Sequence, residues 1–237
     1  MKDLQTLATL LTYREKVERS RIIIEEAIER HGRDGVVVAH SLGKDSIVVW
    51  HLTQIVCGDL EVDPVRGFII TTVHKPEATK RFMLNEMGRY PDQLTVFQAP
   101  FDSPTDLYET DPDACCDLLK VEPTMRALRE MNAQAWMTGL RCTEGRTRTT
   151  YQEVENQDDP TAIEKVNPIL LWTEREVWQY LALNRIHVNP LYAEGYRSLG
   201  CEPCSSKTSD GGSERDGRWL GTSKCGGECG IHSRPMK

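Results

Sequence analysis

The sequence lacks a long apolar run and an excess of positive charge. No stretch approaches the roughly 18 consecutive apolar residues that a membrane-spanning helix requires. The first twenty residues, MKDLQTLATLLTYREKVERS, contain acidic and polar residues where a signal peptide has an unbroken apolar core. The formal net charge of -7 argues against a general nucleic-acid-binding or membrane-surface protein, although it allows a local basic pocket for an anion. We therefore expect a cytoplasmic protein that binds neither nucleic acid nor membranes.

The sequence also lacks internal repeats, and its composition is ordinary for a globular protein. Of the 237 residues, 39% are apolar and 27% are charged, which is enough for the core of one domain. Segments rich in β-branched residues are predicted as strands at 36–40, 66–72, 94–100 and 135–139. Segments with helical spacing of apolar residues are predicted as helices at 4–30, 44–57, 76–90, 115–132, with a break near Pro123, and 173–184. This alternation predicts an α/β fold, a Rossmann-like doubly wound, mainly parallel sheet with helices on both faces.

Aliphatic residues become scarce after the last C-x-x-C motif. From Ser205 the chain reads SSKTSDGGSERDGRWLGTSKCGGECGIHSRPMK, which is rich in Gly and Ser. Such a composition cannot build a core of its own. We expect one domain over residues 1–205 and a mobile C-terminal tail over residues 206–237, able to dock locally.

A short polar loop interrupts the segment VVVAHSLGKDSIVV (36–49), between a predicted strand and a predicted helix. Gly43 allows a close backbone approach, Ser41 and Ser46 offer hydroxyls, and Lys44 adds positive charge at a helix N-terminus. An ordinary strand-to-helix turn capped by Ser41 is the alternative, and the loop lacks the spacing of the Walker pattern. Its position after the first strand of an α/β sheet favours phosphate binding.

Eight cysteines are the other unusual feature, because disulfides are rare in a reducing compartment and clustered cysteines there more often hold a metal or carry redox chemistry. Cys115 and Cys116 are adjacent, and Cys201 and Cys204 form a C-x-x-C motif. Taken alone, these residues favour a zinc site or buried thiols over an iron–sulfur cluster. Adjacent cysteines on a helix lie about 100° apart, so both could reach one cluster only if the helix is locally distorted.

Several segments resemble one family, the sulfonucleotide reductases of the adenine-nucleotide α-hydrolase-like superfamily. The loop SLGKDS (41–46) is similar to the S-x-G-x-D-S pyrophosphate loop of the superfamily, which also includes ATP pyrophosphatases. ACCDLLKVEP (114–123) and GCEPCSS (200–206) resemble the cysteine segments of those reductases that carry a four-iron four-sulfur cluster. ECGIH (228–232), preceded by DGRWLGTSK, resembles the signature that contains the nucleophilic cysteine of the family.

This resemblance implies a thiol-dependent reduction of adenylylsulfate or phosphoadenylylsulfate to sulfite, with release of AMP or its 3′-phosphorylated form, in sulfate assimilation and cysteine biosynthesis. Cys229 is then the nucleophile that carries an S-sulfo group, and thioredoxin or a glutaredoxin-like protein is the reductant. The implied cofactor is a [4Fe-4S] cluster, with Lys120 between the cluster and the substrate. Its ligands would be Cys115, Cys116, Cys201 and Cys204.

Arginines supply the rest of the expected substrate site. The segment WMTGLRCTEGRTRTTY (136–151) places three of them after a predicted strand, where guanidinium groups suit sulfate and phosphate oxygens. A solvated loop paired with Glu144 is the alternative. The full set of expected substrate-binding residues is Ser41, Gly43, Lys44, Asp45, Ser46, Arg141, Arg146, Arg148 and His232.

The nucleotide is the least specified part of this assignment. The tripeptide Lys44-Asp45-Ser46 is closer to ATP pyrophosphatases than to many reductases, and residues 71–73 read TTV where the family often has D-T-G. In the resembled family, the paired cysteine motifs most often accompany the use of adenylylsulfate, although some members accept both nucleotides, so the resemblance favours adenylylsulfate. An ATP pyrophosphatase-type adenylating enzyme of thiolation chemistry, and a non-catalytic iron–sulfur or zinc sensor, are the alternatives, and the ECGIH segment argues against both. The sequence leaves a homo-oligomer open.

Overall fold

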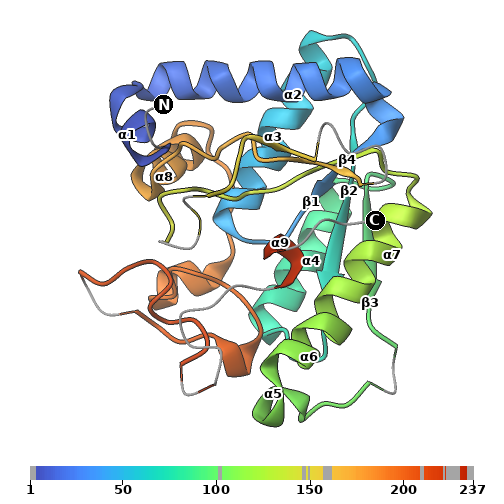
Figure 1. Cartoon of the computed structure of the whole chain (residues 1–237), viewed down its shortest axis with the longest axis vertical. Helices are drawn as coiled ribbons and strands as arrows, with labels where there is room; N and C mark the ends of the chain where they lie inside the picture. Colours follow the sequence, from blue (N-terminus) through green and yellow to red (C-terminus); the bar gives the residue numbers. More distant parts are fainter. Residues whose placement is uncertain are drawn as a thin grey trace.

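The computed structural model of the chain is built around a six-stranded sheet covered by helices (Figure 1). The structure describes residues 4–100, 103–145, 148, 150–156, 162–208, 211–220, 222 and 230–233. The strands in these ranges are β1 (Val36–Ala39), β2 (Arg66–Thr71), β3 (Leu94–Gln98), β4 (Ala135–Met137), β5 (Val154–Glu155) and β6 (Glu164–Val166). Their order is β3-β2-β1-β4-β6-β5, and only β5 pairs antiparallel with its neighbour. The predicted α/β fold with a mainly parallel sheet is confirmed.

The helices follow the strands along most of the chain. The α-helices are α1 (Leu4–Leu10), α2 (Tyr13–Gly35), α3 (Lys44–Asp59), α4 (Glu77–Arg89), α5 (Leu107–Thr110), α6 (Pro112–Cys116), α7 (Glu122–Glu130), α8 (Glu174–Leu183) and α9 (Gly230–Ser233). A π-helix, η1 (Asp117–Val121), joins α6 to α7, and two 3-10 helices are η3 (Pro190–Glu194) and η4 (Glu202–Cys204). Among the helices in the described part of the chain, none has the length and apolar composition of a membrane span.

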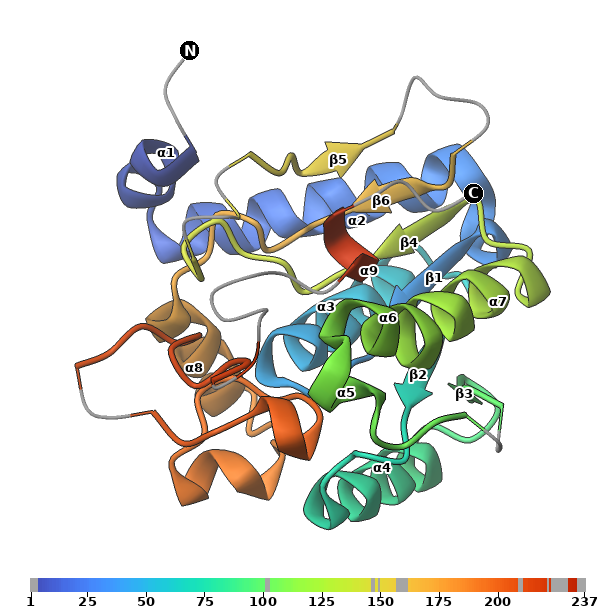
Figure 2. The same cartoon turned by 60° about the horizontal axis from the view of Figure 1, so that its bottom comes forward.

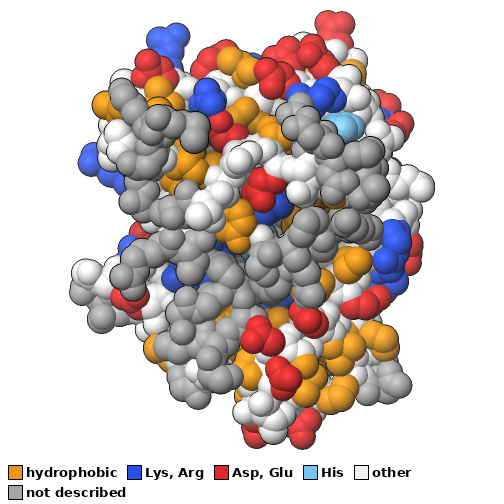
Figure 3. Space-filling view, viewed as in Figure 1, with side chains coloured by type: hydrophobic (Ala, Val, Ile, Leu, Met, Phe, Trp, Pro, Cys, Tyr) orange, Lys and Arg blue, Asp and Glu red, His pale blue; other side chains and the backbone are white. Residues whose placement is uncertain are grey.

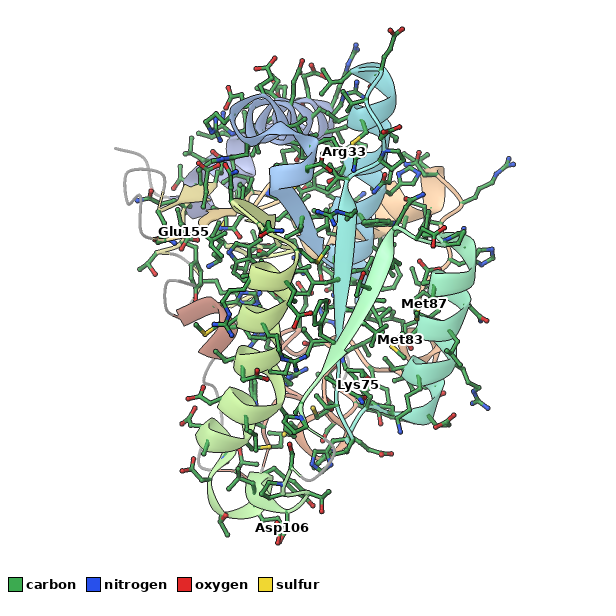
Figure 4. All side chains as sticks on the ribbon, turned by 90° about the vertical axis from the view of Figure 1, so that its right-hand side faces the viewer. Arg33, Lys75, Met83, Met87, Asp106 and Glu155 are labelled. Carbon is green, nitrogen blue, oxygen red and sulfur yellow. The ribbon has the colours of Figure 1, made fainter. Side chains whose placement is uncertain are left out.

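Apolar side chains on both faces of the sheet hold the helices in place. Successive residues of a strand point to opposite faces, so Val38 packs with the cluster that contains α2 and α3, and Val37 packs with Leu128 of α7. Figure 4 shows Met83 and Met87 of α4 turned toward the sheet, where they extend the first of these clusters. The side chains of Val36, Val37 and Val38 in β1 belong to these clusters and are fully buried, which is typical of a central parallel strand.

The path of the chain reverses at β1. The chain runs from β1 through α3 to β2 and through α4 to β3, and then returns through α7 to β4 on the other side of β1. The carboxyl ends of β1 and β4 are therefore adjacent. The connection after β1 leads toward β2 on one side of the sheet, and the connection after β4 leads toward β6 and β5 on the other side. Open α/β sheets bind ligands at this switch point.

Two local predictions are wrong, and two short strands were missed. The helix predicted at 4–30 is two helices, because the Thr12 hydroxyl accepts from the Glu15 N–H and the Glu15 carboxylate accepts from the Thr12 N–H, which starts α2 anew. The break near Pro123 is absent, since Pro123 lies in the first turn of α7, where a missing N–H is tolerated. The irregular turn lies before it, in η1. The strands β5 and β6 were not predicted, because two or three residues are too few for a periodic pattern.

His40, directly after β1, is a buried titratable group in this core. Its ring contacts Trp50 of α3 edge-on, with ring centroids 5.8 Å apart, and its Nε2 lies 3.9 Å from a carboxylate oxygen of Glu86 in α4. Neither ring nitrogen has a hydrogen-bond partner within the described residues. Burial lowers the pKa of His40 from 6.5 to about 4, because the imidazolium would lose its hydration there.

The variant His40→Phe tests this assignment through the pH dependence of stability. The unfolded chain takes up a proton near pH 6.5 and the folded chain only near pH 4, so acidification through this window destabilises the wild type. The expected loss in unfolding free energy is about 1.4 kcal/mol per pH unit. His40→Phe should lack this part of the slope, as measured by guanidinium unfolding at a series of pH values. Parallel curves for the two proteins would contradict the prediction.

Candidate active site

The polar loop (Ser41–Ser46) lies at the switch point and lines the pocket there. The Ser41 hydroxyl donates to the Ser46 hydroxyl oxygen at 3.0 Å, and the Ser46 hydroxyl donates to the Gly43 carbonyl oxygen at 3.0 Å. Leu42 adopts a left-handed conformation with φ of 68°. Gly43 is the N-cap of α3 and provides no capping side chain, so the N-terminus of this 16-residue helix opens toward the pocket. This arrangement suits an anion.

The segment after β4 supports the loop from the side. A Cβ atom at Gly139 would lie 2.7 Å from the backbone nitrogen of Ser46 and 2.8 Å from the carbonyl carbon of Asp45. Distances this short exclude any side chain, so the two backbones touch only because residue 139 is glycine. Gly139 therefore fixes the distance between the loop and the end of β4.

Beneath the loop, four charged side chains form a buried ion-pair network (Lys44, Asp45, Arg141 and Glu214). Lys44 Nζ lies 2.9 Å from Glu214 Oε2 and 3.4 Å from Asp45 Oδ2. Arg141 donates from Nε to Asp45 Oδ1 at 2.6 Å and from Nη2 to Glu214 Oε2 at 2.5 Å. The Lys44 and Arg141 side chains are 1% and 0% exposed, so each cation is held by carboxylates rather than by water.

Glu214 was not a candidate in the sequence, because it lies in the expected tail. It belongs to a docked segment (residues 211–220) that packs on the domain. Trp219 in this segment is 1% exposed and clusters with Cys201 and Cys204, and its N–H donates to the Cys204 carbonyl at 3.0 Å. Burial raises the pKa of Glu214, and Arg141 and Lys44 offset this only in part.

Lys44 also lines the pocket, and further cations line it with Lys44. These side chains come from the loop after β2, from η1, from the loop after β4 and from the docked segment, and they are Lys75, Lys120, Arg148, Arg215 and Arg218. Figure 3 shows Lys and Arg side chains at the bottom of the hollow in this face of the molecule, and Figure 4 labels Lys75 beyond the end of β2. The pocket is thus locally cationic in a protein of net charge -7, as the expected anion site requires.

The structure places the predicted arginines differently from one another. Arg141 belongs to the buried ion-pair network and does not line the pocket, whereas Arg148 lines it and pairs with Glu144. Arg146 lies outside the described residues. Arg215 and Arg218 were missed. The tryptophan at position 219, close to both arginines in the sequence, is the feature that could have indicated them. In the structure the guanidinium groups of Arg215 and Arg218 lie 5.3 and 4.4 Å from the centroid of the Trp219 ring.

The short helix α9 lies near β4 (Figure 2), and its Ile231 and His232 line the pocket. Its His232 ring stacks parallel to Trp136 of β4, with ring centroids 6.3 Å apart, and Lys165 Nζ donates to the His232 carbonyl at 3.3 Å. Burial, with the nearby charges of Arg148 and Lys165, lowers the pKa of His232 well below its usual value. Cys229 and Cys225 lie outside the described residues, but Cys229 directly precedes Gly230, the first residue of α9.

The four cysteines expected to hold a cluster are all buried near the same end of the sheet. Cys115 and Cys116 end α6, and the π-helix η1 begins directly after them, which is a local distortion of the helix. Lys120 belongs to η1, the element that directly follows Cys115 and Cys116, and its positive charge lowers the pKa of the Cys201 thiol. The charge of Lys120 is therefore felt at the second cysteine pair as well. Burial raises the pKa of the Cys201 thiol, but Lys120, Lys75 and a hydrogen bond with Thr72 lower it by more, so the net shift is downward.

The chemistry of this donor set fits an anionic iron–sulfur cluster, because buried thiols beside cations favour thiolates. The four cysteine side chains do not form a closed set of metal ligands in this structure. In the described ranges, no three Cys, His, Asp or Glu side chains converge closely enough to hold an ion.

Residues 35–207 match the family model of the phosphoadenosine phosphosulfate reductase domain. The chain is 36% identical over 208 residues to the adenosine 5'-phosphosulfate reductase of Bacillus mycoides (strain KBAB4), covering 84% of this chain and 85% of that protein. The reductase of the same name from Burkholderia cepacia is 34% identical over 231 residues, covering 92% of this chain and 87% of that protein.

Two solved structures share the fold. The phosphoadenylyl-sulfate reductase of Candida auris, in a phosphate complex, has a TM-score of 0.62 at 20% identity and covers 84% of this chain and 98% of that chain. The FMN adenylyltransferase of Candida glabrata has a TM-score of 0.66 at 15% identity and covers 89% of this chain and 73% of that chain. At such identities the likeness concerns the fold alone.

The substitution Gly139→Ala tests the role of the loop as a phosphate seat. The added methyl group would displace the backbone of Asp45 and Ser46, at a cost of about 1–3 kcal/mol in unfolding free energy. We expect roughly ten-fold weaker AMP binding in calorimetric titration, which corresponds to about 1.4 kcal/mol. The matched control is Gly58→Ala in α3, where a Cβ would meet nothing within 4 Å. Equal AMP affinities for the two variants would contradict the assignment.

Proposed function

Because the chain belongs to the phosphoadenosine phosphosulfate reductase domain family, and is therefore an oxidoreductase of sulfate assimilation that reduces a sulfonucleotide, we propose that its substrate is adenylylsulfate. The products are sulfite and AMP. The name of the relatives at 36% and 34% identity, adenosine 5'-phosphosulfate reductase, supports this substrate over the 3′-phosphorylated one. The observation that carries the proposal is the convergence of the polar loop, the pocket cations and α9 at one pocket.

In this proposal the polar loop and the N-terminus of α3 bind the phosphate of the nucleotide. Ser41 and Ser46 offer hydroxyls, and Gly43 allows the phosphate to approach the backbone. Arg148, Arg215 and Arg218 bind the sulfate end, because guanidinium groups match tetrahedral oxyanions and stay charged. This neutralises charge that would otherwise repel an attacking thiolate.

Cys229 is the proposed nucleophile. Its thiolate attacks the sulfate sulfur, a sulfur–sulfur bond forms, and the bond between that sulfur and the phosphate oxygen breaks with its electron pair on AMP. A dithiol protein of the thioredoxin or glutaredoxin type then attacks Cys229 Sγ, which releases sulfite and leaves a mixed disulfide. The second thiol of the donor resolves this disulfide, so the donor is oxidised by two electrons and Cys229 returns as a thiol. The position of α9 supports this role, because Gly230 is bonded to Cys229.

We further propose that Cys115, Cys116, Cys201 and Cys204 hold a [4Fe-4S] cluster. When bound, the cluster would supply fixed negative charge and order beside the pocket rather than a reacting group. Lys120 lines the pocket and acts on Cys201, so it would lie between the cluster and the sulfate end of the substrate.

The test of the function is turnover with adenylylsulfate and with phosphoadenylylsulfate in parallel, with thioredoxin as the donor and sulfite as the readout. We expect adenylylsulfate to be preferred. Cys229→Ser should lower the rate of sulfite formation by roughly a thousand-fold or more while AMP binding is retained, because only the nucleophile is lost. Cys225→Ser, four residues away in the same segment, is the matched control and should remain active.

Sulfite release by Cys229→Ser at a rate near that of the wild type would end the proposed mechanism. Pyrophosphate release from ATP, with no sulfite from either sulfonucleotide, would instead indicate an adenylating enzyme on the same fold.

The cluster is tested by anaerobic purification. The wild type should contain about four irons per chain and absorb visible light, and Cys204→Ser should lose both. Cys57→Ser is the control, because Cys57 is buried in a different part of the core. Stoichiometric zinc without iron would contradict the assignment.

A further inference from the structure

The docked segment connects two sites of different character. Glu214 points into the buried ion-pair network, where its carboxylate oxygen bridges Lys44 Nζ at 2.9 Å and Arg141 Nη2 at 2.5 Å. The next residue, Arg215, and Arg218 line the pocket, whereas Glu214 and Arg141 do not. The segment therefore has an anchoring side chain below the loop and two cationic side chains in the pocket.

The anchor depends on charge. The network contains two cations and two carboxylates, all with side chains at most 17% exposed. Besides Asp45, Glu174 lies 3.9 Å from Lys44 Nζ and Glu144 acts electrostatically on Arg141, but Glu214 is the carboxylate that bridges Lys44 and Arg141 from the docked segment. A buried pair that loses one partner is strongly destabilised, because the remaining charge is neither hydrated nor compensated.

The docked segment has other contacts with the domain. Arg197 donates to the Gly212 carbonyl, Arg218 donates to the Leu199 carbonyl at 2.6 Å, Arg215 pairs with Glu144 at 3.5 Å, and the backbone N–H groups of Trp219 and Ser206 donate to the Cys204 and Gly217 carbonyls at 3.0 and 2.8 Å. None of these contacts joins the segment to the polar loop. Glu214 does so through Lys44, a residue 170 positions away in the sequence.

We propose that Glu214 is a positioning residue for the reaction. Its ion pairs with Lys44 and Arg141 fix the docked segment against the polar loop and so place Arg215 and Arg218 in the pocket. Arg141 then serves only to hold this anchor, whereas Lys44 both holds it and lines the pocket together with Arg148, Arg215 and Arg218. The inference rests on the proposed function only for the identity of the ligand.

Hydrogen exchange measured by mass spectrometry on the full chain tests the anchor without any assumption about substrate. Glu214→Gln keeps the shape of the side chain and removes its charge, so exchange in peptides covering 211–220 should become roughly ten-fold faster or more. Asp216→Asn is the matched control. It makes the same charge change two residues away, at an exposed carboxylate that accepts only from the Ser213 N–H at 2.7 Å among the described contacts. Exchange in Asp216→Asn should stay within about two-fold of the wild type.

Lys44→Met provides a second variant, which keeps the test decisive if Glu214→Gln does not fold. Because Lys44 forms the other end of the pair, this substitution in the loop should also speed exchange in the distant 211–220 peptides. Unchanged exchange across 211–220 in either variant that folds would overturn the proposal.

Kinetics distinguish positioning from plain stabilisation. Glu214→Gln should raise the KM for adenylylsulfate and the Kd for AMP by roughly ten-fold, with a smaller change in kcat, at temperatures where circular dichroism shows the variant folded. A residue that only stabilises the fold would lower the melting temperature and leave KM unchanged, which would overturn the proposal. If the wild type released no sulfite, the proposed function would fail, while the exchange data would still decide the role of Glu214.

Discussion

The site depends on the pairing of buried charges beneath the polar loop. Lys44 and Asp45 belong to the first turn of α3, Arg141 follows β4, and Glu214 comes from the end of the chain. Each of these charges would be costly to bury alone, and each is compensated by the others. The network thus ties three segments that are distant in the sequence to one point, the end of β1, and the geometry of the pocket follows from that point.

An acidic protein presents a cationic pocket here because cations outnumber acids among the lining residues. Lys44, Lys75, Lys120, Arg148, Arg215 and Arg218 line the pocket against the carboxylates of Asp45 and Glu144, and Glu144 pairs with both Arg148 and Arg215. Solvent screens the exposed acids that contribute to the net charge of -7. A local cationic site is therefore compatible with a negative net charge.

The sequence was informative where a pattern repeats or a motif is dense. Four strands and the polar loop could be read directly, because β-branched runs and the string SLGKDS are local signals. The docked segment could not, since a composition of Gly, Ser and charged residues predicts no core, whereas one buried Trp219 and the ion pairs of Glu214 hold it. Partners of a buried charge are set by tertiary contacts, so neither Glu214 nor its role could be inferred from spacing. The start of α2 was missed, although the capping pair Thr12 and Glu15 is a local signal that could have indicated it.

The residues that form the fold and several of the residues proposed for the chemistry lie in different parts of the chain. The family match covers residues 35–207, which contain the sheet, the polar loop and the four cysteines of the expected cluster. Glu214, Arg215, Arg218 and the proposed nucleophile all follow it. An adenylyltransferase of similar fold shows that such a sheet serves other reactions. In the proposed function, the seat of the nucleotide therefore belongs to the common sheet, whereas the residues proposed to specify the reaction follow that sheet in the chain.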